Sequence, residues 1–289
     1  MGHNMKDINI VHINIRGILT SQTELNLHIN ERQPHVITLN ETFLKPHNKL
    51  KIPNYNIIRK DRRDRRNGGV AILYQKDLPV TEVELPGQFH KCEALAVKVR
   101  IPNWPLHIST IYNPPENPIP KDPINYLSKF HKSILLIDIN AHHHSLGDHP
   151  ALNNRQGLDL TNMLRRSNYA NVPIPGPTRY PQTPRETFTS PEKILATKPI
   201  TNRIKVITIH EPPNSDHAPV QITIHTLFWK PITQPTVRLT PDYDKGDWTL
   251  FRQLTEAPIT DMDVEPTRIL DVDKYDNTTP SRYHKYYTS

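Results

Sequence analysis

Several strand-like segments of this chain end in side chains that can bind a metal ion or move a proton. The apolar run at residues 134–137 is followed by Asp138, by Asn140 and by three consecutive histidines that begin at His142. Comparable residues follow four other apolar runs, namely Asn14, Glu41, Tyr112 and the pair Asp216 and His217. Open α/β sheets place their ligand and catalytic groups at the carboxyl ends of strands. We therefore expect these side chains to meet at one edge of a sheet system.

Together these residue types are sufficient to hydrolyse a phosphodiester. Glu41 offers carboxylate oxygens to Mg²⁺, a hard ion that prefers oxygen ligands. Such an ion polarises a phosphoryl oxygen and stabilises the leaving oxygen. Asp138, with Asn140, could orient or deprotonate the attacking water, while His217 could bind the charge developing on the phosphate or take a proton. Tyr112 offers a neutral donor. Each residue alone also has a structural explanation, so the hypothesis depends on the whole set.

The hydrophobic pattern predicts the elements that would carry these residues. Strands are predicted at residues 8–15, 36–39, 70–74, 92–99, 106–112, 134–137, 187–195, 204–209 and 218–224. Helices are predicted at residues 20–32, 124–130 and 157–167, and residues 169–185 are predicted to form a proline-rich loop. The first strand, helix and strand close by about residue 40, which suits a right-handed βαβ crossover.

Composition limits the function classes. The chain has 289 residues, 29 prolines, a formal net charge of +7 and a pI near 9.3, which favours a polyanionic partner. Residues 226–289 hold ten acidic and eight basic residues and one short helical pattern at residues 248–254. We predict a domain at residues 1–225, followed by a linker or the start of an absent region at residues 226–289.

Other features bear on location and on charge. The single cysteine, Cys92, excludes an internal disulfide and favours a reducing compartment. No apolar run reaches 18 residues and the first residues lack an apolar signal core, so we expect an intracellular protein with no membrane partner. Residues 59–66 carry six basic side chains. This basic run is expected to be a solvated loop, with a phosphate-contacting loop as the alternative.

Five motifs, taken together, resemble the endonuclease/exonuclease/phosphatase superfamily. They are Val-His-Ile-Asn14-Ile-Arg-Gly, Leu-Asn-Glu41-Thr, Ile-Tyr112-Asn-Pro-Pro, Ile-Asp138-Ile-Asn140-Ala-His-His and Asn-Ser215-Asp216-His217-Ala-Pro-Val. More narrowly, the chain resembles the apurinic-type endonuclease domain of non-LTR (LINE-like) retrotransposons. Asn67-Gly-Gly-Val-Ala-Ile-Leu and the Asn-Ala-His-His continuation favour this branch over repair enzymes or sphingomyelinases. The resemblance covers roughly residues 7–225.

The resemblance implies an α/β fold: a four-layer sandwich of two packed mixed β-sheets flanked by helices. It also implies nicking of double-stranded DNA with Mg²⁺, Mn²⁺ being the alternative ion. Glu41 would bind the metal with Asn14 and Asp216 nearby, Asp138 and Asn140 would position water, and His217 would contact the scissile phosphate. Tyr112, Asp216 and Glu192 would belong to the same catalytic set. The residues implied in DNA binding are Asn113, His142, Thr178 and Ser215.

Three positions depart from the family pattern. Ile137 stands where a glycine is usual, which we expect to restrict close approach of the backbone at that strand end. Leu146 replaces a tryptophan. Glu192 stands where the family has an aspartate that orients the catalytic histidine, and it is longer by one methylene. A catalytically impaired DNA-binding relic is therefore one alternative function. A general phosphodiesterase or abasic-site endonuclease of the same fold is another.

The resemblance also implies a biological context. A nick that leaves a 3′-hydroxyl would prime reverse transcription of a retrotransposon, which places the activity in the nucleus. Residues 243–251 are similar to the segment that connects such endonucleases to a reverse transcriptase. Element RNA would then be a partner through that absent downstream polymerase.

Overall fold

The computed structural model of the protein describes residues 7–63, 66–89, 92–101, 104–183, 185–209, 215–226 and 247–256. The chain divides into two units, Met1–Ile232 and Thr233–Ser289. The described part of the second unit is a single helix, α5 (Trp248–Glu256), at the position where a short helix is predicted. The rest of the predicted linker lies outside the described residues.

The first unit contains two six-stranded mixed sheets. The first sheet has the order β11-β12-β1-β2-β4-β3, with β11 (Ile204–Ile209), β12 (Val220–His225), β1 (Asp7–Asn14), β2 (Val36–Asn40), β4 (Val70–Gln75) and β3 (Tyr55–Lys60). The second has the order β5-β6-β7-β8-β10-β9, with β5 (Val80–Glu82), β6 (Glu93–Ile101), β7 (Trp104–Tyr112), β8 (Ser133–Asp138), β10 (Glu192–Thr197) and β9 (Tyr169–Val172). Each sheet therefore draws most of its strands from a continuous part of the chain.

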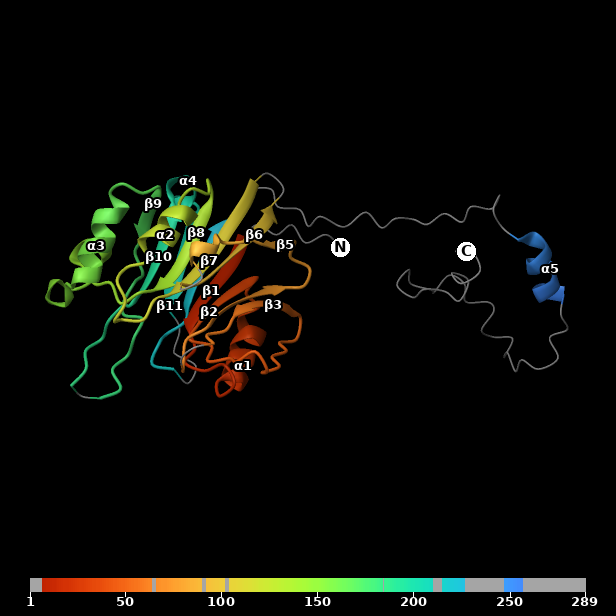
Figure 1. Ribbon diagram of the computed structural model, residues 1–289, viewed down its shortest axis with the longest axis horizontal. Coiled ribbons are helices and arrows are strands. Elements are labelled where there is room, and N and C mark those ends of the chain that lie inside the picture. The colour runs from red at the N-terminus through yellow and green to blue at the C-terminus, as the bar shows by residue number, and fades with distance from the viewer. Residues whose placement is uncertain are drawn as a thin grey trace. The chain divides into compact units, whose positions relative to one another are not determined.

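Each sheet contains one parallel strand pair, and a helix connects its two strands. β1 and β2 are joined by α1 (Gln22–Arg32), and β7 and β8 by α2 (Lys121–Leu127). Helix α3 (Arg155–Leu164) follows β8, and the short α4 (Lys198–Thr201) follows β10. In Figure 1, α1 lies on one side of the packed sheets, and α2 and α3 lie on the other.

Three buried clusters correspond to this layering. The largest lies between the sheets and joins residues of β1, β4 and β12 to residues of β6, β7 and β8. A second cluster lies under α2 and α3, and a third lies under α1. The predicted four-layer α/β sandwich is confirmed. Among the described residues, none of the helices has the length and apolar character needed to cross a bilayer.

The inner faces of the sheets change from apolar to polar near one edge. Alternate residues of a strand share a face. On β1 the buried Ile8 and Ile10 are followed on that face by His12 and Asn14. On β8 the buried Ile134 and Leu136 are followed in the same way by Asp138. The candidate catalytic residues therefore lie on the same strand faces as the apolar residues that pack the two sheets together.

The same alternation determines which face of the sheet the Ile137 side chain occupies. Its side chain is fully buried in the cluster under α2 and α3, on the face opposite to Asp138. Leu146 is buried in the same outer cluster. The expectation that Ile137 restricts the catalytic edge was wrong, because its bulk lies outside the sheet.

Several element boundaries differ from those predicted. Helix α2 begins at Lys121, before the predicted residue 124, because Pro123 lies in the first helical turn, where no backbone donor is needed. The strand predicted at residues 187–195 instead spans Glu192–Thr197. The predicted proline-rich loop begins with β9, which pairs with β10. Strands β3 and β5 were not predicted, since both are short and largely exposed or half-buried.

Candidate active site

Side chains from both sheets meet at the polar edge. Asn14 ends β1, Tyr112 ends β7 and Asp138 ends β8. Glu41 directly follows β2 in a left-handed backbone conformation with φ of 53°. Glu192 begins β10, which runs antiparallel to β8 and pairs Glu192 with Asp138. Residues 215–217 reach the same place from the loop before β12.

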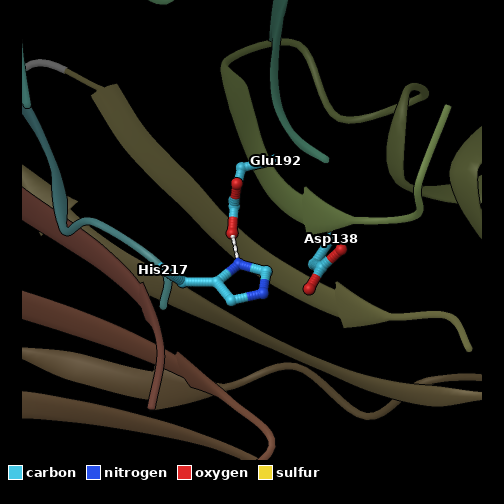
Figure 2. Close-up of side chains that lie close together, drawn as sticks. All are labelled: Asp138, Glu192 and His217. Carbon is cyan, nitrogen blue, oxygen red and sulfur yellow. Dashed lines mark hydrogen bonds and ion pairs between the residues drawn. The ribbon is translucent and has the colours of Figure 1, made fainter. Parts of the chain in front are cut away.

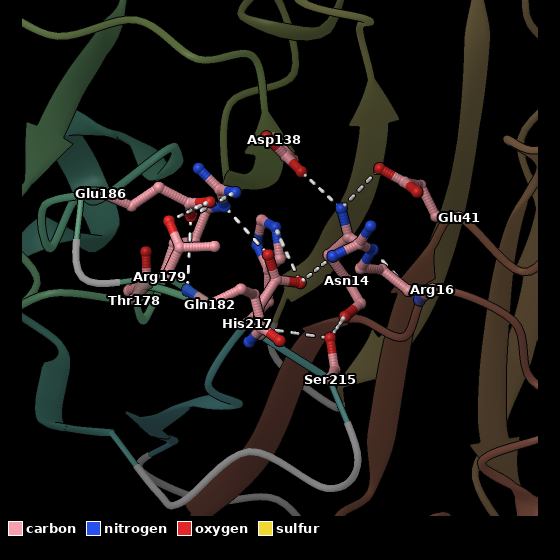
Figure 3. Close-up of polar contacts among 12 residues, drawn as sticks. Asn14, Arg16, Glu41, Asp138, Thr178, Arg179, Gln182, Glu186, Ser215 and His217 are labelled. Atoms are coloured by element: carbon pink, nitrogen blue, oxygen red, sulfur yellow. Dashed lines mark hydrogen bonds and ion pairs between the residues drawn. The ribbon is translucent and has the colours of Figure 1, made fainter.

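Asn14 connects the two sheets through its side-chain amide. Its Nδ2 donates to Glu41 Oε1 at 2.9 Å and to Asp138 Oδ2 at 2.7 Å (Figure 3). Asn14 and Asp138 are almost fully buried. One amide therefore fixes the separation of two carboxylates that come from different sheets.

His217 is held by a buried carboxylate. Its Nδ1 contacts Glu192 Oε1, and Thr178 donates from Oγ1 to the other oxygen, Glu192 Oε2. Figure 2 shows the ring between Glu192 and Asp138, with its second nitrogen facing Asp138. The extra methylene of Glu192 is accommodated, since both of its oxygens have partners. Glu192 therefore fixes the position of the imidazole ring and favours its protonated form.

The charges at this edge shift two pKa values in useful directions. Burial, and then the negative charge of Glu192, raise the pKa of Asp138 from 3.8 to about 7. Burial alone would lower the pKa of His217, but Glu192 outweighs it and raises that pKa from 6.5 to about 9. At neutral pH His217 is therefore an imidazolium, and Asp138 titrates near the working pH, which suits a general base.

Tyr112 remains a neutral donor. Burial raises the pKa of its hydroxyl, and the negative charge of Glu41 and a hydrogen bond to Glu41 raise it further. The proton therefore stays on the phenol throughout the physiological range. The hydroxyl can donate to a phosphate oxygen without forming a phenolate.

Asp216 is paired with two arginines. Its Oδ1 accepts from Arg16 Nη1 at 2.6 Å, and its Oδ2 accepts from Arg179 Nε at 3.0 Å. Burial alone would raise the pKa of Asp216, but these contacts hold it below its usual value. The Arg16 side chain is 49% exposed, so a guanidinium borders the site at its solvent side. Neither Arg16 nor Arg179 was predicted at this site.

Asn140 sits in a loop fixed by α3. It has φ of 49°, and its carbonyl accepts from Asn154 Nδ2 at 2.7 Å. Asn154 caps α3 and also accepts from the backbone of His142 at 3.0 Å and of Gly157 at 2.8 Å. The start of α3 thus holds the loop that follows Asp138. The sequence pattern did not connect Asn154 with the loop after Asp138, because the connection is made by the side chain that caps α3.

Replacing Gly157 with alanine is expected to destabilise the domain. A Cβ at this position would lie 1.9 Å from the carbonyl oxygen of His142, so the first turn of α3 and the loop would have to separate. Such overpacking costs about 1–3 kcal/mol. Urea unfolding measures the change, and Gly87→Ala, where a Cβ would meet no atom within 4 Å, is the matched control. An unchanged midpoint would mean that α3 does not hold this loop.

A divalent ion fits the oxygen donors at this edge. Asp138 Oδ1 is buried without a hydrogen-bond partner among the described residues, and Glu41 lies across the Asn14 amide from it. Carboxylate and amide oxygens are the ligands that Mg²⁺ prefers. Asp216, also expected near the ion, has both oxygens on arginines. Glu41 and Asn14 are therefore the residues best suited to hold the ion, and Asp138 Oδ1 faces them as the oxygen that can accept a proton.

A second ligand set overlaps with this one. Asp138, Glu192 and His217 each offer an atom, and these atoms lie within 4.8 Å of one another. Carboxylates with an imidazole suit a transition metal, but only a neutral imidazole can ligate it. The raised pKa of His217 and the contacts of Glu192 favour a salt bridge here. A hard divalent ion therefore fits the oxygen donors around the Asn14 amide better.

The four residues expected to bind DNA occupy different environments. Thr178 is fully buried and donates to Glu192, so its hydroxyl is not accessible to DNA. Asn113 is almost buried and donates to backbone carbonyls of residues 114, 117 and 118. His142 pairs with Asp148 at 3.2 Å. Ser215 donates to the Asn14 carbonyl at 2.9 Å and accepts from the His217 amide. The contacts of these four residues are with other residues of the protein, and they stabilise the loops around the site.

Shortening Glu192 to aspartate, the residue usual at this position, is expected to lower activity about tenfold. The shorter side chain cannot keep both Thr178 and His217, and a displacement near 1 Å costs up to about 10²-fold in rate. The rate of phosphodiester hydrolysis, with Glu82→Asp, exposed on β5, as the matched control, measures this effect. A gain in rate would instead mean that the longer residue impairs the enzyme.

Comparisons with known proteins agree with this geometry. Residues 106–221 match the protein family described as Endonuclease-reverse transcriptase. No curated protein matches the sequence. The fold is similar to the endonuclease domain of TRAS1, a telomere-specific non-LTR retrotransposon, with a TM-score of 0.64 and 16% identity over 76% of this chain and 100% of that one.

Two further solved structures share the fold. The AP endonuclease LMAP from Leishmania major has a TM-score of 0.61 and 13% identity, over 77% of this chain and 89% of that one. The 3′ phosphatase NExo from Neisseria, bound to a product DNA hairpin, has a TM-score of 0.53 and 14% identity, over 76% of this chain and 100% of that one. The resemblance found in the sequence is confirmed by the family match and these folds.

Proposed function

We propose that this protein, whose fold and family match are those of the endonuclease/exonuclease/phosphatase superfamily, is a Mg²⁺-dependent endonuclease that nicks double-stranded DNA. The observation that carries the proposal is the Asn14 amide, which joins Glu41 of one sheet to Asp138 of the other. Beside it, His217 is charged and held by Glu192. A metal-binding carboxylate, a base and an imidazolium at one buried edge are the groups that phosphodiester hydrolysis needs.

In the proposed reaction a water oxygen attacks phosphorus and the bond from phosphorus to the 3′ oxygen breaks. Asp138 accepts the proton of that water through its unpartnered oxygen, and Asn140 positions the water. His217 and Tyr112 donate to the phosphate oxygens, where charge develops. Mg²⁺, when bound, polarises the phosphoryl group and stabilises the leaving oxygen. The 3′ oxygen takes a proton from solvent, so the products are a 3′-hydroxyl and a 5′-phosphate.

A plasmid assay tests the proposal. Purified full-length protein with Mg²⁺ should convert supercoiled plasmid to open circles, and EDTA should stop the conversion. Glu41→Ala, Asp138→Ala and His217→Ala should each reduce it, while His144→Ala, an exposed residue of the histidine run, should not. If open circles form equally with the three site variants, the assignment of the site is wrong.

The nick would serve reverse transcription. A free 3′-hydroxyl can be extended by a polymerase, and in a retrotransposon this primes copying of the element's RNA at a target in the nucleus. The similarity to the TRAS1 endonuclease domain supports this role. Extension of the nicked strand by an added DNA polymerase, without prior phosphatase treatment, tests the chemistry of the end. A 3′-phosphate would contradict the proposal.

An abasic-site endonuclease is the second candidate, favoured by the likeness to the Leishmania major AP endonuclease. Cleavage of an abasic duplex and of the same duplex without the lesion separates the two functions. A strong preference for the abasic duplex would contradict the retrotransposon role. A DNA-binding relic would instead bind DNA in a salt-dependent way and show no nicking with Mg²⁺ or Mn²⁺. The intact contacts of Glu192 argue against that loss.

A further inference from the structure

The basic run at residues 59–66 is not simply a solvated loop. Lys60 Nζ donates to the carbonyl of Cys92 at 2.8 Å, and Arg62 forms an ion pair with Glu93. The side chains of Arg62 and Glu93 are each only 12% exposed. Arg63, in contrast, is exposed. The expectation of a solvated run therefore fails at Arg62, where the pairing is directed toward β6.

Arg62 lies over the ring of Tyr112. Its Cζ is 5.6 Å from the ring centroid. Glu93 and Tyr112 are cross-strand partners on β6 and β7, so the carboxylate that holds Arg62 stands beside the ring. A guanidinium over an aromatic face is attracted by the ring electrons, more strongly where water is excluded. Arg62 is thus fixed by a carboxylate on one side and by a phenol on the other.

A glycine turn makes room for this arrangement. The backbone amide of Gly69 donates to Glu93 Oε2. Gly68 has φ of 74°, and a Cβ there would lie 2.4 Å from Arg62 Cζ. The two glycines therefore leave the space that the guanidinium fills and supply a donor to its partner. This accounts for the Asn-Gly-Gly sequence directly after the basic run.

The same turn also holds the segment that follows Glu41. The amide of Thr42 donates to the carbonyl of Gly69 at 3.1 Å, and that of Phe43 donates to the carbonyl of Gly68 at 2.8 Å. Glu41 lies near enough to the Tyr112 hydroxyl for its negative charge to raise the pKa of that phenol. One turn therefore fixes the backbone beside the carboxylate and, through Arg62, the phenol that contacts it.

We propose that Arg62, held by Glu93 and the Gly68–Gly69 turn, is a positioning residue for Tyr112. It keeps the phenol ring in the orientation that directs its hydroxyl toward Glu41 and the phosphate. The kinetic part of this inference rests on the proposed nuclease function. Its structural part, the contact between Arg62 and the ring, does not.

The kinetic experiment compares Arg62→Met with Arg63→Met, which removes the same charge one residue away. Arg62→Met is expected to lower kcat for nicking about tenfold with little change in KM, and Arg63→Met to leave kcat within about twofold. Arg62→Lys, which keeps the cation, should recover most of the rate. In a Tyr112→Phe background, Arg62→Met should cause no further loss, because the two act through one group. Additive losses would overturn the proposal.

A second measurement is independent of activity. The protein is labelled with 3-fluorotyrosine, and Tyr112→Phe identifies the ¹⁹F resonance of residue 112. Arg62→Met should move this resonance more than Arg63→Met does, and an unmoved resonance would overturn the inference even if the wild type proves inactive. Wild-type protein that fails to nick would overturn only the proposed function. If Arg62→Met does not fold, Glu93→Gln, which loosens Arg62 without removing it, should show the same resonance shift and rate loss.

Discussion

Asp138→Asn is expected to lower the nicking rate about 10³-fold. Asparagine keeps the size and one hydrogen-bonding oxygen for Asn14 but cannot accept the proton of the attacking water. The aspartate also supplies charge, since its raised pKa of about 7 leaves it partly ionised at neutral pH. Single-turnover nicking at saturating Mg²⁺ measures the loss, and fluorescence anisotropy measures DNA affinity.

Asp159→Asn is the matched control for this substitution. Asp159 lies on α3 and pairs with Arg155 at 3.2 Å, away from the polar edge. It should nick DNA at the wild-type rate. A loss in Asp138→Asn no greater than that in Asp159→Asn would mean that another group accepts the proton.

His217→Asn is expected to lower the nicking rate by a similar factor, about 10³-fold. It should also abolish the fall in rate at alkaline pH. The wild-type imidazolium is fully formed well below its pKa of about 9 and is lost as the pH rises through that value. Wild-type nicking should therefore fall above pH 9. The residual activity of the variant should show no such fall. A wild-type rate that rises steadily from pH 8 to 10 would contradict the role of a charged His217.

The same pKa shifts predict how this pair affects folding. The folded-state pKa of His217 is raised above 6.5, so its stabilising contribution is complete below pH 6.5 and is lost as the pH rises through about 9. The pKa of Glu192 is lowered by His217 and Thr178 despite burial, so its contribution is lost only in acid. In urea unfolding of the metal-free protein, His217→Asn should differ most from the wild type near pH 6 and least above pH 9.

Much of the site could be predicted from the strand ends. Asn14, Tyr112 and Asp138 each end an apolar run, and the alternation of buried residues places them on a shared inner face. Glu41 also follows an apolar run, but it has the alternation of the outward-facing Ile37 and Leu39 and reaches the site through its left-handed backbone. A period of two specifies which face a side chain takes, and the carboxyl end of a strand specifies the edge. These rules apply to any strand whose pattern is clear.

Other residues could not be found in this way. Glu192 reaches the site from the amino end of an antiparallel strand, where the rule for carboxyl ends does not apply. Arg16, Arg62 and Arg179 act through long side chains whose direction depends on tertiary contacts, so a charge run in sequence cannot separate Arg62 from the exposed Arg63. The buried position of Thr178 follows from its pairing with residue 218, a contact between distant loops.

The order of the strands has a consequence for when the enzyme can first act. All strands of the second sheet lie in the chain between β4 and β11, while β12 returns to pair with β1, joining His225 to Asp7. Because contacts so distant in sequence form late, Asn14 and Glu41 cannot meet His217 until the ribosome has delivered almost the whole domain. A nascent chain, or one cut short within the second sheet, would carry its carboxylates without the histidine that completes them. The topology thus leaves the candidate site incomplete until the last strand of the domain has been made.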